Sequence, residues 1–152
     1  MKILDQSGRL EILARIDRLE QGLAARWGRM TVAQMICHLS DSYLVLLGAR
    51  ASQPRITWNS RYFLRWAALR LPVAWPQGVP TLPESDQMIG GTRPSGDFAA
   101  DKARLVALVN RFSPGTPGVR FAPHPVFGPL SDWELLRWGY LHADHHLRQF
   151  GQ

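Results

Sequence analysis

Three of the five histidines in the chain lie within its last dozen residues, at His142, His145 and His146. The apolar spacing around them predicts a helix, on which residues four apart share a face with about 5–6 Å between their Cβ atoms. The imidazoles of His142 and His146 could therefore coordinate one metal ion. His145 is an alternative to His146, because residues three apart on a helix also meet.

A third ligand is predicted at His38, in the middle of an earlier helical pattern. Leu135 and Trp138 share the face of His142 and His146, so this pair should point into the protein, whereas Asp144 should point into solvent. Three histidines from two facing helices would leave coordination positions open for water or substrate, as catalytic zinc sites do. A pair spaced by four also arises by chance, and a buried histidine is often only hydrogen-bonded.

Two familiar metal motifs do not fit. A zincin helix needs His-Glu-x-x-His, but Ala143 follows His142. A di-iron bundle needs Glu-x-x-His pairs, and Gly139 and Ala143 stand where the two glutamates should be.

Several polar or aromatic residues near these histidines are candidates for a supporting role. Gln149 could hydrogen-bond a ligand, Asp41 or Ser42 could orient an imidazole through its second nitrogen, and His124 could line the mouth of the site. Each could equally be an ordinary structural or solvated residue. The candidate pocket and supporting residues are Gln149, Asp41, Ser42, Trp138, His145 and His124.

Length and composition favour one globular domain over residues 1–152 in the cytoplasm. The chain is 45% hydrophobic and 20% charged, and Cys37 is its only cysteine, so no internal disulfide forms. No apolar run approaches the ~18 residues of a membrane span, and the first residues lack the apolar core of a signal peptide. The net charge of +6 comes from scattered arginines, which argues against a nucleic-acid partner.

The hydrophobic spacing predicts an all-α fold without strands. Helical patterns cover about residues 8–21, 31–48, 59–70, 97–112 and 131–150, and two of them open with the capping boxes Thr31–Gln34 and Ser131–Glu134. Four main helices and one long connection predict an antiparallel four-helix bundle. The connection is a proline-rich crossover that carries the short 59–70 helix and the prolines Pro72, Pro76, Pro80, Pro83 and Pro94.

The short crossover helix carries an aromatic stripe of Trp58, Tyr62 and Trp66, continued by Leu69. We expect this stripe to pack over the bundle, although it could instead form a homodimer contact or a pocket wall. Binding to a membrane surface is disfavoured, because a short helix with few basic residues binds lipid weakly.

Three segments resemble an uncharacterised subfamily of the DinB/YfiT-like superfamily of metalloenzymes. They are Trp27-Gly28-Arg29-Met30-Thr31, the His-Pro-x-Phe-Gly-x-Leu stretch from His124 to Leu130, and the His-His-Leu-Arg-Gln-Phe-Gly ending from His145 to Gly151. The resemblance implies a DinB-like four-helix bundle whose metal ligands are His38, His142 and His146. It also implies zinc or nickel as the metal, with iron and manganese as further candidates.

Some members of that superfamily are transferases or isomerases that use a small thiol, and their common ending is His-Arg-Gly-Gln. Here the ending is His146-Leu147-Arg148-Gln149, with the arginine displaced by one residue. A metal held by three neutral histidines would act as a Lewis acid and lower the pKa of a bound water or thiol, so we expect a metal-dependent hydrolase or thiol-dependent transferase acting on a small molecule. The alternative is a non-catalytic domain that binds a metal or a small ligand.

Overall fold

The computed structural model describes residues 1–79 and 81–152. Within these ranges every regular secondary-structure element is a helix. No strand occurs in these two ranges, where β-type pairing is limited to a single bridge between His124 and Gly128. The predicted all-α fold class is confirmed. Pro80, one of the prolines in the predicted crossover, lies outside the described residues.

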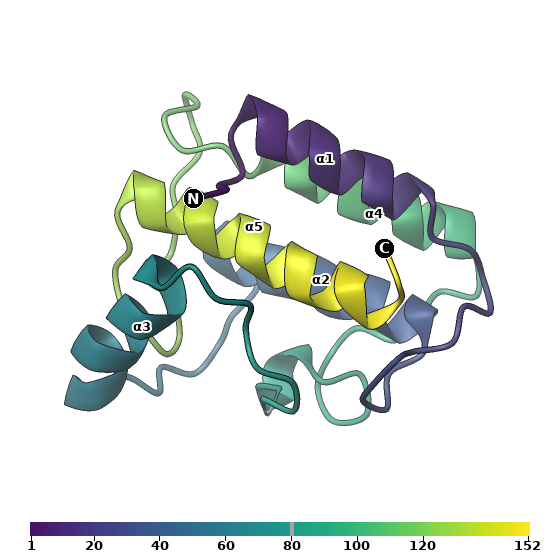
Figure 1. Cartoon of the computed structure of the whole chain (residues 1–152), viewed down its shortest axis with the longest axis horizontal. Helices are drawn as coiled ribbons and strands as arrows, with labels where there is room; N and C mark the ends of the chain where they lie inside the picture. Colours follow the sequence, from purple (N-terminus) through teal and green to yellow (C-terminus); the bar gives the residue numbers. More distant parts are fainter. Residues whose placement is uncertain (80) are drawn as a thin grey trace.

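The five α-helices follow the predicted order with small shifts at their ends (Figure 1). Both predicted capping boxes are present, so the helices that follow Thr31 and Ser131 begin where they were expected. The first helix begins earlier than predicted because the Asp5 side chain caps it. The helices are α1 (Gln6–Asp17), α2 (Val32–Leu46), α3 (Arg65–Arg70), α4 (Phe98–Arg111) and α5 (Asp132–Gln149), with a π-helical turn η1 (Ser60–Leu64) leading into α3 and a 3₁₀ turn η2 (Pro83–Ser85).

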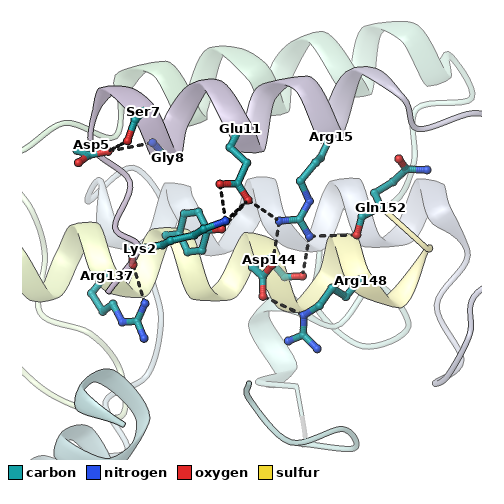
Figure 2. Close-up of polar contacts among 11 residues, drawn as sticks. Lys2, Asp5, Ser7, Gly8, Glu11, Arg15, Arg137, Asp144, Arg148 and Gln152 are labelled. Carbon is teal, nitrogen blue, oxygen red and sulfur yellow. Dashed lines mark hydrogen bonds and ion pairs between the residues drawn. The ribbon is translucent and has the colours of Figure 1, made fainter. Parts of the chain in front are cut away.

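Polar contacts show that α1 and α5 run side by side in the same direction (Figure 2). Glu11 accepts a hydrogen bond from the Tyr140 hydroxyl at 2.7 Å, and one turn further along Arg15 pairs with Asp144 at 2.8 Å. Asp144 also pairs with Arg148 at 2.9 Å. The prediction that Asp144 is solvated was therefore wrong, because α1 covers the face of α5 that looks away from the histidines.

Helices α2 and α5 run in opposite directions. The Tyr43 hydroxyl donates to the Gly139 carbonyl at 2.8 Å, and earlier on α2 His38 meets His142, which is later on α5. Helices α1 and α4 are also antiparallel, since Arg9 bonds the carbonyls at the end of α4 while Lys102 bonds the Asp17 carbonyl. Consequently α2 and α4, which pack on each other, run the same way and are joined by the long connection 47–97.

Each of the four longer helices sends aliphatic side chains into a shared core. Ile12, Leu39, Leu105 and Leu147, one from each helix, are fully buried there. Removing such side chains from water is the main favourable contribution to folding, at about 1.5–3 kcal/mol each. The core fixes the spacing of α2 and α5, and so the positions of the histidines between them.

The Tyr43 hydroxyl tests the importance of the α2–α5 contact. We expect Tyr43→Phe to lower the free energy of unfolding by about 1 kcal/mol, because it removes one buried hydrogen bond and keeps the ring. Urea denaturation measures this. Tyr62→Phe, which changes an exposed tyrosine of η1, is the matched control, and equal stability of the two variants would contradict the assignment.

Candidate metal centre

Helices α2 and α5 bring His38, His142 and His146 into one cluster. Each of the three offers one ring nitrogen, and these nitrogens all lie within 4.8 Å of one another. The Nε2 atoms of His38 and His142 are 3.1 Å apart, and the His146 ring centroid lies 4.6 Å from that of His38 and 5.0 Å from that of His142. The cluster could hold a metal ion.

The tautomer of His38 is fixed by the loop that precedes α4. Its Nδ1 lies 2.9 Å from the carbonyl oxygen of Ser85, in η2, and a carbonyl can only accept, so Nδ1 carries the proton. The same carbonyl accepts from the buried Gln87 amide at 3.0 Å. His38 therefore presents an unprotonated Nε2 to the cluster, the form that a metal ligand requires.

Gln149 fixes the tautomer of His146 in the same way. Its Nε2 donates to the Trp27 carbonyl at 2.7 Å, which turns its Oε1 toward His146 Nδ1 at 3.0 Å. His146 Nδ1 must donate to that oxygen, so its Nε2 is also free. Gly28 makes room for this contact, because a Cβ at Gly28 would lie 2.7 Å from the Gln149 amide nitrogen, and its φ of +80° also favours glycine.

His142 differs from the other two histidines. Its Nδ1 is buried and has no hydrogen-bond partner among residues 1–79 and 81–152. Since His38 Nε2 is unprotonated, the 3.1 Å contact between the two rings requires His142 to donate from Nε2. To act as a ligand through that atom, His142 must instead hold its proton on Nδ1.

Burial keeps all three imidazoles neutral. It lowers the pKa of His38, and it holds the pKa values of His142 and His146 well below the usual value, with the neighbouring imidazoles adding to the effect. Neutral imidazole is the form that coordinates metals. The cluster is therefore in its ligand form at neutral pH.

Two tryptophans lie beside His142. Trp138 packs against His142 with ring centroids 4.7 Å apart, and Trp75 lies 6.0 Å from the same ring. Trp75 comes from the proline-rich connection and is held by a 2.8 Å hydrogen bond from its Nε1 to the Ala68 carbonyl of α3. Both tryptophans therefore flank the His142 ring.

Comparison with known proteins places the chain in a family. A family model matches residues 2–152, nearly the whole length. The chain belongs to the family described as Protein of unknown function (DUF1569). Comparisons with curated proteins and with solved structures gave no match. The function of this DUF1569 member has to be argued from its site.

The other residues of interest in this DUF1569 chain lie at different distances from the cluster. His145 is buried beside His146, with ring centroids 5.1 Å apart, and its ring also meets Trp27. Asp41 accepts from the Thr92 backbone and hydroxyl, both at 2.7 Å, and lies 3.4 Å from Arg50, so it anchors the connection 47–97. Within the described residues it forms no hydrogen bond with an imidazole. Ser42 is buried on α2.

His124 organises the loop before α5. Its Nδ1 accepts backbone N–H bonds from Val126 and Phe127, both at 3.1 Å, and its ring stacks on that of Phe127 at 4.5 Å. Burial lowers its pKa to about 3. Trp138 separates it from the cluster, contacting His124 on one side and His142 on the other.

Sequence reasoning missed two residues of this site. Ser85 acts through its backbone carbonyl, which no side-chain motif reveals. Trp75 lies in the proline-rich connection, where no periodicity places a side chain. Trp27 and Gly28, by contrast, belong to the Trp-Gly-x-Met-Thr segment that leads into α2, and this segment was the available signal.

The depressed pKa of His124 makes stability fall in acid. Its pKa is about 3 in the folded chain and near 6.5 when unfolded, so the unfolded chain binds the proton first. The free energy of unfolding that neutral His124 contributes is complete above pH 6.5 and is lost progressively as the pH falls toward 3.

His124→Asn should reduce this pH dependence, because an asparagine oxygen can still accept from the loop N–H groups but does not titrate. Between pH 6 and pH 4, roughly the window set by these pKa values, the slope of the unfolding free energy against pH should be smaller in the variant than in the wild type by about 1.4 kcal/mol per pH unit. Urea titrations with a chelator present measure it. An unchanged slope would show that His124 is protonated in the folded chain.

Proposed function

We propose that this chain binds one divalent metal ion through His38, His142 and His146, and uses it for hydrolysis or thiol-dependent transfer on a small molecule. The observation that carries the proposal is the orientation of the supporting groups. Ser85 and Gln149 fix the imidazoles of His38 and His146 with Nε2 unprotonated, and one ring nitrogen of each lies within 4.8 Å of a ring nitrogen of His142. Such fixing of the second ring nitrogen is characteristic of metal-binding histidines.

Zinc and nickel are the metals we favour, followed by iron and manganese. Imidazole nitrogens suit zinc and nickel, and three neutral ligands leave positions for another group. When bound, the ion would keep its full charge and act as a Lewis acid that lowers the pKa of a water or thiol.

The protein's own contribution is to position the ligands and to exclude water. Ser85 and Gln149 hold the rings of His38 and His146, while Trp138 and Trp75 form walls that a small substrate would contact. Asp41, one turn along α2 from His38, is committed to Thr92. Because Asp41 is occupied by these hydrogen bonds, we expect a group of the substrate to accept the proton if the protein is an enzyme. The alternative is a non-catalytic binding domain.

We also propose a fold family and a cellular location for this chain. Helices α1, α2, α4 and α5 would form a DinB-like four-helix bundle in which the connection 47–97 is the crossover. The parallel direction of α2 and α4 supports this, since it requires one long connection. We place this single domain, residues 1–152, in the cytoplasm.

Metal analysis of the purified protein tests the ligand set. After equilibration with zinc or nickel and removal of the excess, the wild type should retain one ion per chain, and His38→Ala and His142→Ala should retain little. His145→Ala, which changes the neighbouring buried histidine, is the matched control and should retain the ion. A metal-free wild type would refute the proposal, and full occupancy of His38→Ala would exclude that ligand.

The support from Gln149 is tested by affinity. We expect Gln149→Ala to weaken zinc binding about 10- to 100-fold, because His146 loses the group that fixes its proton and ring orientation. Competition with a chromophoric chelator measures the change. Arg148→Ala, which removes a partner of Asp144 at the same helix end, should bind zinc as the wild type does, and equal loss in both variants would contradict a specific role of Gln149.

A further inference from the structure

The segment that forms η1 and α3 exposes its aromatic side chains instead of burying them. Trp58 is 77% exposed, Tyr62 56%, Phe63 62% and Trp66 54%. The prediction that the stripe Trp58, Tyr62 and Trp66 packs over the helices was wrong, although Leu69 does pack and is fully buried. Four large exposed aromatic side chains on one short segment are unusual for a surface that faces only water.

The inward face of this segment is attached to the rest of the protein by hydrogen bonds and an ion pair. Ser60 donates to the Val126 carbonyl at 2.8 Å, and Arg65 forms a two-bond ion pair with Glu134 of α5. These contacts hold η1 and α3 beside the beginning of α5, at the side of the molecule (Figure 1). The aromatic side chains are therefore presented outward by a fixed support.

The charged residues that the segment itself carries are all basic. No Asp or Glu lies between Asp41 and Glu84, whereas five arginines do, namely Arg50, Arg55, Arg61, Arg65 and Arg70. Arg61 and Arg70 are exposed and form no ion pair within the described ranges. Arg61 lies 5.8 Å from the Tyr62 ring centroid, and Arg70 lies 4.3 Å from that of Trp133.

The small number of basic residues disfavoured a membrane surface in the sequence, but that expectation assumed aromatic side chains packed on the protein, and all four are exposed. We propose that this surface, defined by Trp58, Tyr62, Phe63, Trp66, Arg61 and Arg70, docks the protein onto the surface of an anionic phospholipid bilayer. Tryptophan and tyrosine favour the headgroup region of a bilayer, where the ring is buried and the polar end stays hydrated. Phe63 would enter the acyl boundary, and Arg61 and Arg70 would pair with lipid phosphates.

Charge separates this occupant from a second copy of the chain. A symmetric dimer through this surface would place the arginines of one copy against the same basic patch of the other, with no carboxylate of the same segment to offset the repulsion. A single-stranded nucleic acid could stack on the rings, but Phe63 and the exposed Leu64 beside it gain more from hydrocarbon than from bases. No helix in the two described ranges has the length and apolarity to span a bilayer.

Vesicle sedimentation tests the proposal with the full chain. The protein should bind to vesicles that contain phosphatidylcholine and phosphatidylglycerol, and it should bind much more weakly to vesicles of phosphatidylcholine alone. Added salt should weaken the binding. Arg61→Glu should reduce the partition coefficient by about thirtyfold, since it replaces an attracted charge by a repelled one. Trp58→Ala with Trp66→Ala should reduce it at least as much.

Matched controls change the same residue types elsewhere. Arg111→Glu, at the exposed end of α4, and Leu10→Ala, an exposed apolar side chain of α1, should bind vesicles as the wild type does. Circular dichroism and the urea midpoint confirm that every variant is folded. Equal binding to both vesicle types, unchanged binding of the surface variants, binding to homopolymeric single-stranded nucleic acid but not to vesicles, or self-association abolished by the surface variants would each overturn the proposal.

Discussion

Three imidazoles are buried against one another between α2 and α5, and this burial constrains the rest of the site. Charged imidazolium groups at this separation would repel each other in a medium that screens poorly, so all three must be neutral. A neutral imidazole has one donor and one acceptor nitrogen, and a buried donor needs a partner. The protein therefore supplies the Ser85 carbonyl to His38 and the Gln149 amide to His146, which leaves their Nε2 atoms unprotonated within the cluster.

This requirement explains features that lie far from the histidines in the sequence. Gln149 must reach the Trp27 carbonyl, so the chain before α2 passes close to the end of α5 and has a glycine at position 28. Ser85 must lie over α2, so the connection 47–97 is anchored there by Asp41 through Thr92. Helix α3 holds Trp75 over His142. The long connection thus serves the site as well as joining two parallel helices.

Much of this arrangement could be predicted from local rules. The capping boxes at Thr31 and Ser131 placed the starts of α2 and α5, and helical periodicity put His142 and His146 on a common inward face. Local rules could not identify Ser85, because a backbone carbonyl carries no signature in the residue type. They also failed for Asp144 and for the Trp58–Tyr62–Trp66 stripe, since a helix pattern shows which residues share a face but not which neighbouring element covers that face.

Diffraction data from crystals soaked in zinc, collected on both sides of the zinc absorption edge, test the central claim most directly. The account predicts one anomalous peak per chain, about 2.0–2.1 Å from the Nε2 atoms of His38, His142 and His146. In the structure refined from the same crystals, the Nδ1 atoms of His38 and His146 should keep their contacts with Ser85 and Gln149. A cluster without such a peak, or a peak bound by other side chains, would contradict the account.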